Sequence, residues 1–221
     1  MRSIPLVVAL VLIAAATSGC MGGFHSINGS GHVVTETREV SGIKGVEVAG
    51  SGKIILQQGD TERVEITADD NLMQYLTSEV TGSKLTLGTK DWVNVDPTDK
   101  VIYKVFVKDL NSLGISGSVE VEADGVRTDS LTVAVSGSGD IRISGQADEQ
   151  KIAISGSANY EGQNLKSKET SLVVSGSGKA VLAVSEKLDV QVSGSGDVEY
   201  IGEPKVTQSI SGSGSVKQRR S

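Results

Sequence analysis

Residues 131–143 read Leu-Thr-Val-Ala-Val-Ser-Gly-Ser-Gly-Asp-Ile-Arg-Ile, and they show most clearly a pattern that returns along the chain. Apolar side chains occupy every second position on both sides of the Ser-Gly-Ser-Gly tetrapeptide. This alternation has the period of a β-strand, in which successive side chains point to opposite faces, and it does not fit the 3.6-residue period of a helix. The stretch therefore predicts two half-buried strand segments joined by a glycine-rich element.

The same pattern returns along the chain at a nearly constant period. The tetrapeptide or a near variant begins at Ser116, Ser136, Ser155, Ser175, Ser193 and Ser211, with spacings of 20, 19, 20, 18 and 18 residues, and a divergent copy begins at Ala49. Strand alternation at such a period predicts a solenoid whose neighbouring coils share one aliphatic core. We expect an all-β parallel β-helix with coils of 18–20 residues. It forms a single domain over 33–218, less regular over 33–110 and repetitive over 111–218.

The glycines and serines of the tetrapeptide alternate in the same way as the strands. Gly137 and Gly139 share the parity of the apolar residues, so an extended chain would turn these glycines inward and the serines outward. Alternatively, the chain turns at the tetrapeptide and the glycines supply positive φ at a corner. Both geometries remain open at this point. The serines expected to form an exposed ladder are Ser136, Ser138, Ser175, Ser177, Ser193 and Ser195.

The less regular part from residue 33 to residue 110 also alternates as strands do, with one exception. The acidic and amide residues Asp69, Asp70 and Asn71 precede Leu72, Met73, Tyr75 and Leu76. Side chains of this kind commonly cap the amino end of a helix, so the pattern predicts one short helix near residues 69–76, covering an open end or edge of the solenoid.

The amino-terminal end has the features of a lipoprotein precursor. Residues 4–16 are apolar apart from Pro5, too short a run to span a membrane, and they lead into Thr17-Ser18-Gly19-Cys20. That segment resembles the lipobox of bacterial lipoproteins, although Thr17 replaces the usual Leu. Residues 1–19 are thus expected to be a signal peptide, Cys20 the lipidated residue that binds the membrane, and residues 20–32 a flexible spacer. Met21 after the cysteine is compatible with sorting to the outer membrane of the cell envelope.

The sequence offers little for catalysis, for a metal site or for a cofactor. Cys20 is the only cysteine, and the two histidines, His25 and His32, lie in the expected spacer, so no histidine-based triad or zinc site is expected in the folded part. Asp140 and Asp197 are the only plausible calcium ligands after a tetrapeptide, and lysines interrupt their row. We therefore expect no catalytic residue, no metal and no cofactor. The formal net charge of −6 gives no electrostatic reason to bind nucleic acid.

Four segments give the chain a family resemblance. Asp70-Asn71-Leu72, the strand at 84–87, the strand at 103–107 and the repeated tetrapeptides resemble the bacterial "putative auto-transporter adhesin, head GIN domain" family. The resemblance covers roughly residues 40–216. It implies a right-handed β-helix on a secreted or lipid-anchored protein.

The repeat architecture and the expected anchor lead to one preferred functional hypothesis and two alternatives. Solenoids present long repetitive faces that suit recognition of extended partners, so we expect a non-enzymatic, adhesin-like binding domain on the cell envelope, with an envelope or extracellular glycan or protein as partner. The alternatives are a polysaccharide-acting lyase or hydrolase and a periplasmic scaffold with a protein partner. The basic carboxyl end, Lys217-Gln218-Arg219-Arg220, could contact anionic lipid, but a solvated tail is the simpler interpretation.

Overall fold

The fold is all-β, as the alternation predicts. The computed structural model describes residues 25–220. Within them, strands alternate with tight turns, and the one helical element is a single 3-10 turn, Met73–Tyr75. The strands are β1 His25–Asn28, β2 Val33–Glu39, β3 Gly45–Gln58, β4 Arg63–Asp69, β5 Leu76–Thr81, β6 Lys84–Thr89, β7 Val93–Asp96, β8 Ile102–Val107, β9 Ser112–Gly156, β10 Asn159–Gly176, β11 Lys179–Gly194, β12 Asp197–Ile201, β13 Lys205–Gly212 and β14 Ser215–Gln218.

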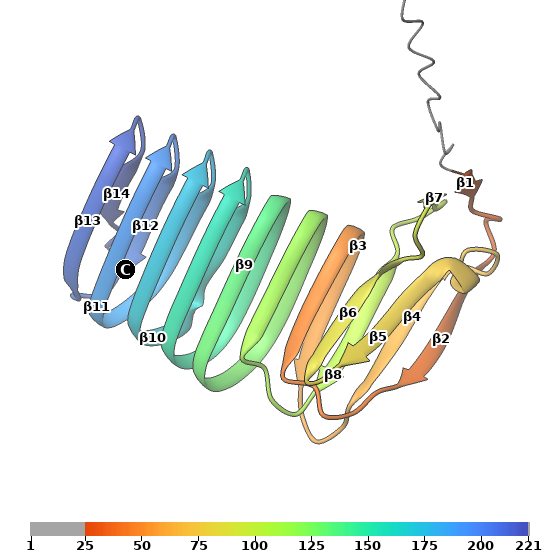
Figure 1. Ribbon diagram of the computed structural model, residues 1–221. Coiled ribbons are helices and arrows are strands. Elements are labelled where there is room, and N and C mark those ends of the chain that lie inside the picture. Colours follow the sequence, from red (N-terminus) through yellow and green to blue (C-terminus); the bar gives the residue numbers. More distant parts are fainter. Residues whose placement is uncertain (1–24, 221) are drawn as a thin grey trace, which may run out of the picture.

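Successive passes of the chain pair in parallel, each about one repeat period from the next. Leu172 of β10 lies opposite Ile152 of β9 on one side and Val190 of β11 on the other. The same parallel pairing joins β3 to β9 and β11 to β12 and β13. Figure 1 shows the result as a row of stacked coils. The observed pairing accounts for the period, while the handedness of winding stays a prediction.

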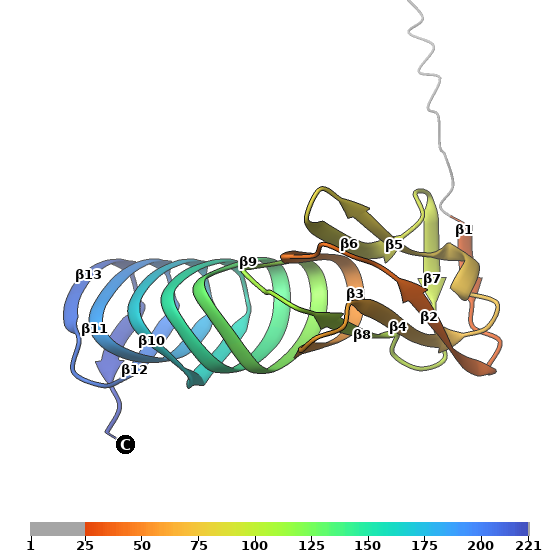
Figure 2. The same ribbon diagram turned by 90° about the horizontal axis from the view of Figure 1, so that it is seen from below.

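Each coil has two long walls, which Figure 2 shows as the upper and lower ribbons of the stack. We call the strand segments before each tetrapeptide the first wall, such as residues 172–175, and the segments after it the second wall, such as residues 159–162. The first wall ends in β13 at one end of the stack and continues through β6 to β5 at the other. The second wall ends in β14 at one end and continues through β8 and β4 to β2 at the other.

The core lies between the two walls and is built from the alternating apolar residues. Leu131 and Val133 of the first wall and Ile141 of the second wall are fully buried. Burying one such side chain contributes about 1.5 to 3 kcal/mol relative to leaving it exposed, and the column repeats in every coil. One continuous aliphatic core therefore holds the coils together.

The tetrapeptide combines the two geometries that the sequence left open. Its first glycine forms a corner, with a φ of +129° at Gly137 and +133° at Gly176, in the region that favours glycine. These glycines stack so closely that a side chain on Gly176 would collide with the carbonyl of Gly156. The second glycine faces inward without positive φ, and Gly178 is buried. The chain therefore turns at the first glycine and keeps the alternation on both sides.

The expected short helix at residues 69–76 is wrong in extent and in its cap. Asp69 ends strand β4, only Met73–Tyr75 form a 3-10 turn, and the residue before that turn, Leu72, makes no side-chain cap. The Asp69 carboxylate instead accepts hydrogen bonds from Gly31 and Thr98. The sequence pattern was misleading because these polar side chains bind other loops of the protein rather than the amino end of a helix.

The expected spacer at residues 20–32 also needs correction. His25–Asn28 form strand β1, which pairs in parallel with Val93–Asp96 of β7. The backbone N–H of Ser30 donates to Asn71 Oδ1 at 3.0 Å. Residues 25–32 therefore belong to the folded part, held by contacts that a Gly, Ser and Asn composition does not indicate. The expected signal peptide, residues 1–19, and the lipidated Cys20 lie outside the described residues.

Candidate binding groove

The six serines of the expected ladder are all exposed, and the corner glycine divides them into two rows. On the first wall, Ser175 lies opposite Ser155 and Ser193. On the far side of the corner, the backbone N–H of Ser177 donates to the Gly156 carbonyl and that of Ser195 to the Gly176 carbonyl, both at 2.9 Å. Ser136 belongs to the first row and Ser138 to the second. The structure therefore places Ser136, Ser175 and Ser193 apart from Ser138, Ser177 and Ser195.

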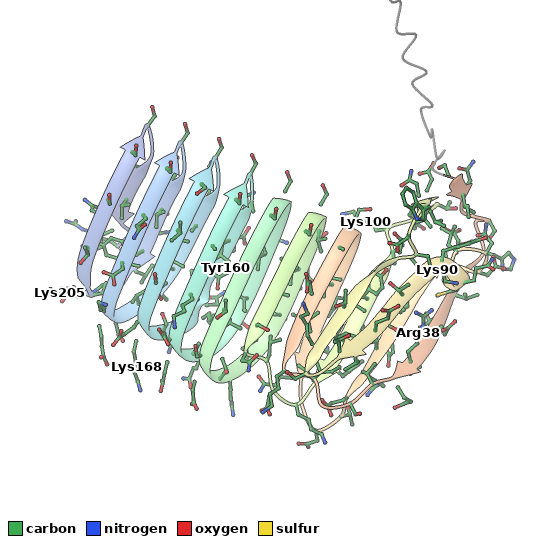
Figure 3. All side chains as sticks on the ribbon, viewed as in Figure 1. Arg38, Lys90, Lys100, Tyr160, Lys168 and Lys205 are labelled. Atoms are coloured by element: carbon green, nitrogen blue, oxygen red, sulfur yellow. The ribbon has the colours of Figure 1, made fainter. Side chains whose placement is uncertain are left out.

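One row borders a groove on the surface of the coils. The groove measures about 830 Å³ and is open to solvent. Its floor is the start of the second wall, with Ser138, Asp140 and Asn159, and its opposite side is the loop of residues 96–101 between β7 and β8. In Figure 3 the loop can be found by its label at Lys100, beside the edge of the coils. The groove brings together Ser138 of the expected ladder and Asp140, which was considered above as a calcium ligand and rejected.

The buried carboxylate of Asp69 fixes the position of this loop. Asp69 is 1% exposed and accepts hydrogen bonds from the Thr98 backbone N–H at 2.9 Å, the Thr98 hydroxyl at 2.9 Å and the Gly31 backbone N–H at 2.7 Å. The hydrogen bond from Thr98 is the main reason that the pKa of Asp69 lies below its ordinary value. Asp69, at the end of β4, thus binds both the segment after β1 and the loop of residues 96–101 that borders the groove.

A cluster of ion pairs lies at the end of the groove nearest β3. Glu120 lies 3.2 Å from Lys100 Nζ and 3.5 Å from Lys53 Nζ, and Lys53 lies 2.8 Å from Glu122. Arg142 extends the cluster to the next coil. The hydrogen bond from Lys100 holds the pKa of Glu120 below its ordinary value. This carboxylate is therefore kept ionised.

The aspartates considered as calcium ligands lie apart in the row that follows the corner. Asn159 Nδ2 donates to Asp140 Oδ1 at 2.8 Å, and Ser215 Oγ donates to Asp197 Oδ1 at 2.7 Å. Lys179 lies between Asn159 and Asp197 in the pairing register. Across residues 25–220 no group of three or more His, Cys, Asp or Glu residues has the geometry to hold a metal ion.

Sequence reasoning missed the loop that completes the groove. Thr98, Asp99 and Lys100 carry no motif, and only the tertiary contact to Asp69 brings them over the coils. No sequence signal marks them, because Asp69 shares the alternation of Glu65 and Thr67 on the half-buried face of β4, and the pattern does not show that its carboxylate is buried. His25 lies in β1 and His32 precedes β2, and neither lines the groove.

Within residues 25–220, no helix has the length and apolar character that crossing a membrane requires. The fold and groove together define a repetitive all-β protein with an open polar surface rather than an enclosed pocket. The family model described as "Putative auto-transporter adhesin, head GIN domain" matches residues 43–204. The chain belongs to this family, and the resemblance found from its repeats is confirmed. Membership in this family indicates an envelope-associated, adhesin-like protein.

Solved structures with the same fold come from species of Bacteroides and Parabacteroides. A "putative adhesin" from Bacteroides fragilis is 21% identical with a TM-score of 0.68, over 88% of this chain and 99% of that chain. A "putative adhesin" from Parabacteroides distasonis is 24% identical with a TM-score of 0.52, and a "putative lipid binding protein" from the same species is 20% identical with a TM-score of 0.53; each match covers 88% of this chain and 100% of the other. The comparison with curated protein sequences gave no match.

Proposed function

We propose that this chain is a lipid-anchored envelope protein whose coils bind an extended glycan, without catalysis, in the groove beneath the loop of residues 96–101. The observation that carries the proposal is the groove itself, an open channel bordered by hydroxyl, amide and carboxylate side chains from successive coils. Ser138 and Ser157 occupy equivalent positions in neighbouring coils. A chain-like ligand could therefore meet the same polar groups once per coil.

The charge of the groove limits which class of glycan it can bind. Its lining includes the carboxylates of Asp96, Asp99, Glu120 and Asp140 against one ammonium group, that of Lys100. None of its lining residues is aromatic, so the sugar rings would be held by hydrogen bonds rather than by stacking. An acidic lining disfavours a polyanion and favours a neutral or amine-bearing glycan.

The ionisation of the groove supports binding rather than glycoside cleavage. A glycosidase needs one carboxyl group with a raised pKa to act as general acid. The pKa of Glu120 is instead lowered by Lys100, which argues against this carboxylate as a general acid. We therefore retain the binding function over the alternative of a polysaccharide-acting enzyme.

The proposed anchor is the lipid on Cys20. Four residues separate Cys20 from the start of β1 at His25, so the proposed lipid would be joined by a short segment to the end of the stack that holds β1, β2 and β7. Several acyl chains on one cysteine would bind firmly, because each buried methylene contributes about 0.8 kcal/mol.

A binding assay with a matched control tests the function. The groove variant carries Asp140→Ala and Asn159→Ala, and the control carries Asp189→Ala and Gln191→Ala, which likewise remove a carboxylate and an amide, but from the first wall. Calorimetry would measure affinity for chitosan oligosaccharides, dextran and alginate. We expect the groove variant to weaken chitosan binding about tenfold or more, from two lost hydrogen bonds of about 1 kcal/mol each. Preferential binding of alginate, or equal loss in the control, would contradict the proposal.

A further inference from the structure

At each end of the stack of coils, the last strands are paired along one edge only. Within residues 25–220, β13 and β14 pair only with β11 and β12, and we call this end the tail. At the opposite end, β2 pairs only with β4 and β5 only with β6, and we call this end the head. Figure 1 shows the two ends far apart, with the coils between them. Backbone N–H and C=O groups on such edges are ready to pair with another strand.

The exposed apolar side chains gather at these two ends. Six large apolar residues among the described ones are exposed, and four lie on the terminal strands. Val33 and Val34 of β2 are 47% and 39% exposed, Val80 of β5 is 38% exposed, and Ile210 of β13 is 39% exposed. Ile210 continues the core column of Val192, so the tail leaves an end of the core uncovered. Both ends therefore have apolar surface that association would bury.

The two ends carry opposite charge. Strands β13 and β14 hold Lys205 and Lys217 and no carboxylate. Strands β2 and β5 hold three glutamates, Glu36, Glu39 and Glu79, against Arg38, which is paired with Glu36 at 2.8 Å. Two tails would repel each other, as would two heads, whereas a tail and a head attract.

The strand directions suit pairing between a tail and a head. Strand β2 is antiparallel to β4, β4 is antiparallel to β8, and β8 runs parallel to β3 and the coils. Strand β2 therefore has the direction of β14, so the second wall of one molecule can continue in parallel into the next. On the first wall, β5 is antiparallel to β6, so β13 would meet it as an antiparallel neighbour. Figure 2 shows β5 and β13 on the upper ribbons, and the strand pairing places β2 and β14 at the two ends of the second wall.

We propose that the tail of one molecule docks on the head of a second copy, through edge strands of complementary charge on both walls. This interaction goes beyond the glycan binding proposed above and uses none of the groove residues. Because the two surfaces differ, the contact is heterologous, and repetition builds an open chain of molecules unless the rotation closes a ring.

Charge reversal at each end tests the proposal in the full chain carrying Cys20→Ser, which cannot be acylated. Head reversal is Glu39→Lys with Glu79→Lys, tail reversal is Lys205→Glu with Lys217→Glu, and the control reverses Lys151 and Lys179 in the middle of the stack. Sedimentation velocity would follow the weight-average mass over a wide range of protein concentration. We expect the mass of the parent and of the control to rise above the monomer, and each end variant to lose this rise.

The decisive variant combines both reversals in one chain. Its head is basic and its tail acidic, so we expect association to return. The rise in mass should also weaken with added salt, since the charges are exposed. A parent that stays monomeric throughout would overturn the proposal and point to a different partner for the tail. Loss of association from tail reversal alone, with head reversal silent, would overturn it in favour of a tail-to-tail dimer.

Discussion

Gly176 and Ser177 are neighbours, but only Gly176 lies where a side chain cannot fit. This difference explains why glycine and serine alternate in the repeated tetrapeptide. Gly176 has a φ of +133° and lies against the backbone of Gly156, whereas Ser177 is exposed. Only glycine fits at position 176, because any side chain there would be strained at positive φ and would collide with the neighbouring coil. The serine needs only to remain in solvent.

A pair of substitutions tests whether Gly176 excludes a side chain that Ser177 tolerates. Gly176→Val should destabilise the protein by more than the 1 to 3 kcal/mol or so typical of overpacking, because backbone strain adds to the collision. Ser177→Val should cost no more than about 1 kcal/mol. Thermal melts of the two variants would measure the difference, at about 2 to 4 °C per kcal/mol. Equal losses would mean that the corner tolerates a side chain.

Asp69 should make the groove sensitive to acid. The pKa of its carboxyl group is lowered in the folded protein, chiefly by Thr98, so the ionised form is favoured by folding. Its contribution is complete above the unfolded pKa, about 3.9, and is lost as the pH falls through the folded value. We expect the protection factors of residues 96–101, which correct hydrogen exchange for its intrinsic dependence on pH, to fall below about pH 4 in the parent. In Asp69→Asn, protection should already be low at neutral pH and should change little with acid; unchanged protection would contradict the assignment.

At the scale of elements, one coil contains a buried polar pair that the sequence pattern did not predict. Tyr160 and Gln150 are 1% and 0% exposed, and the Tyr160 hydroxyl donates to Gln150 Oε1 at 2.9 Å. Within residues 25–220 the Gln150 Nε2 group is buried without a partner. Tyr160 and Gln150 therefore depend on each other for the hydrogen bond between their buried polar atoms.

This dependence predicts a strong coupling between the two residues. Tyr160→Phe or Gln150→Leu alone leaves one buried polar group unpaired and should cost about 1 to 3 kcal/mol. The double variant removes both groups, so its loss should be smaller than the sum of the two single losses. Urea unfolding of the four proteins completes a double-mutant cycle. Additive losses would show that the hydrogen bond contributes nothing.

The strands could be predicted from the sequence because the apolar residues that alternate along the chain are the same residues that are buried in the structure. Leu131, Val133 and Ile141 are core residues in both the pattern and the structure. The groove was predictable only in part. Ser138 and Asp140 belong to the repeat, but Thr98 reaches them through a hydrogen bond to Asp69, a contact between residues 29 positions apart. Local patterns carry no information about such a contact.

At the scale of the whole molecule, the proposed anchor and the coils are separate parts with separate tasks. Cys20→Ser should release the protein from membranes while leaving the coils folded, because the buried core of the described residues lies within residues 43–198. Envelope fractionation would follow the protein and circular dichroism its fold. A variant that still partitions wholly with membranes would rule out the lipid on Cys20 as the anchor.

We propose above that the anchored molecule binds a glycan through the groove of its coils. The most direct measurement is capture of membrane vesicles carrying the intact protein on immobilised chitosan, read by surface plasmon resonance. We predict capture by the parent and by Asp189→Ala with Gln191→Ala, and loss of capture with Asp140→Ala plus Asn159→Ala. Capture that persists undiminished in the groove variant would contradict the claim.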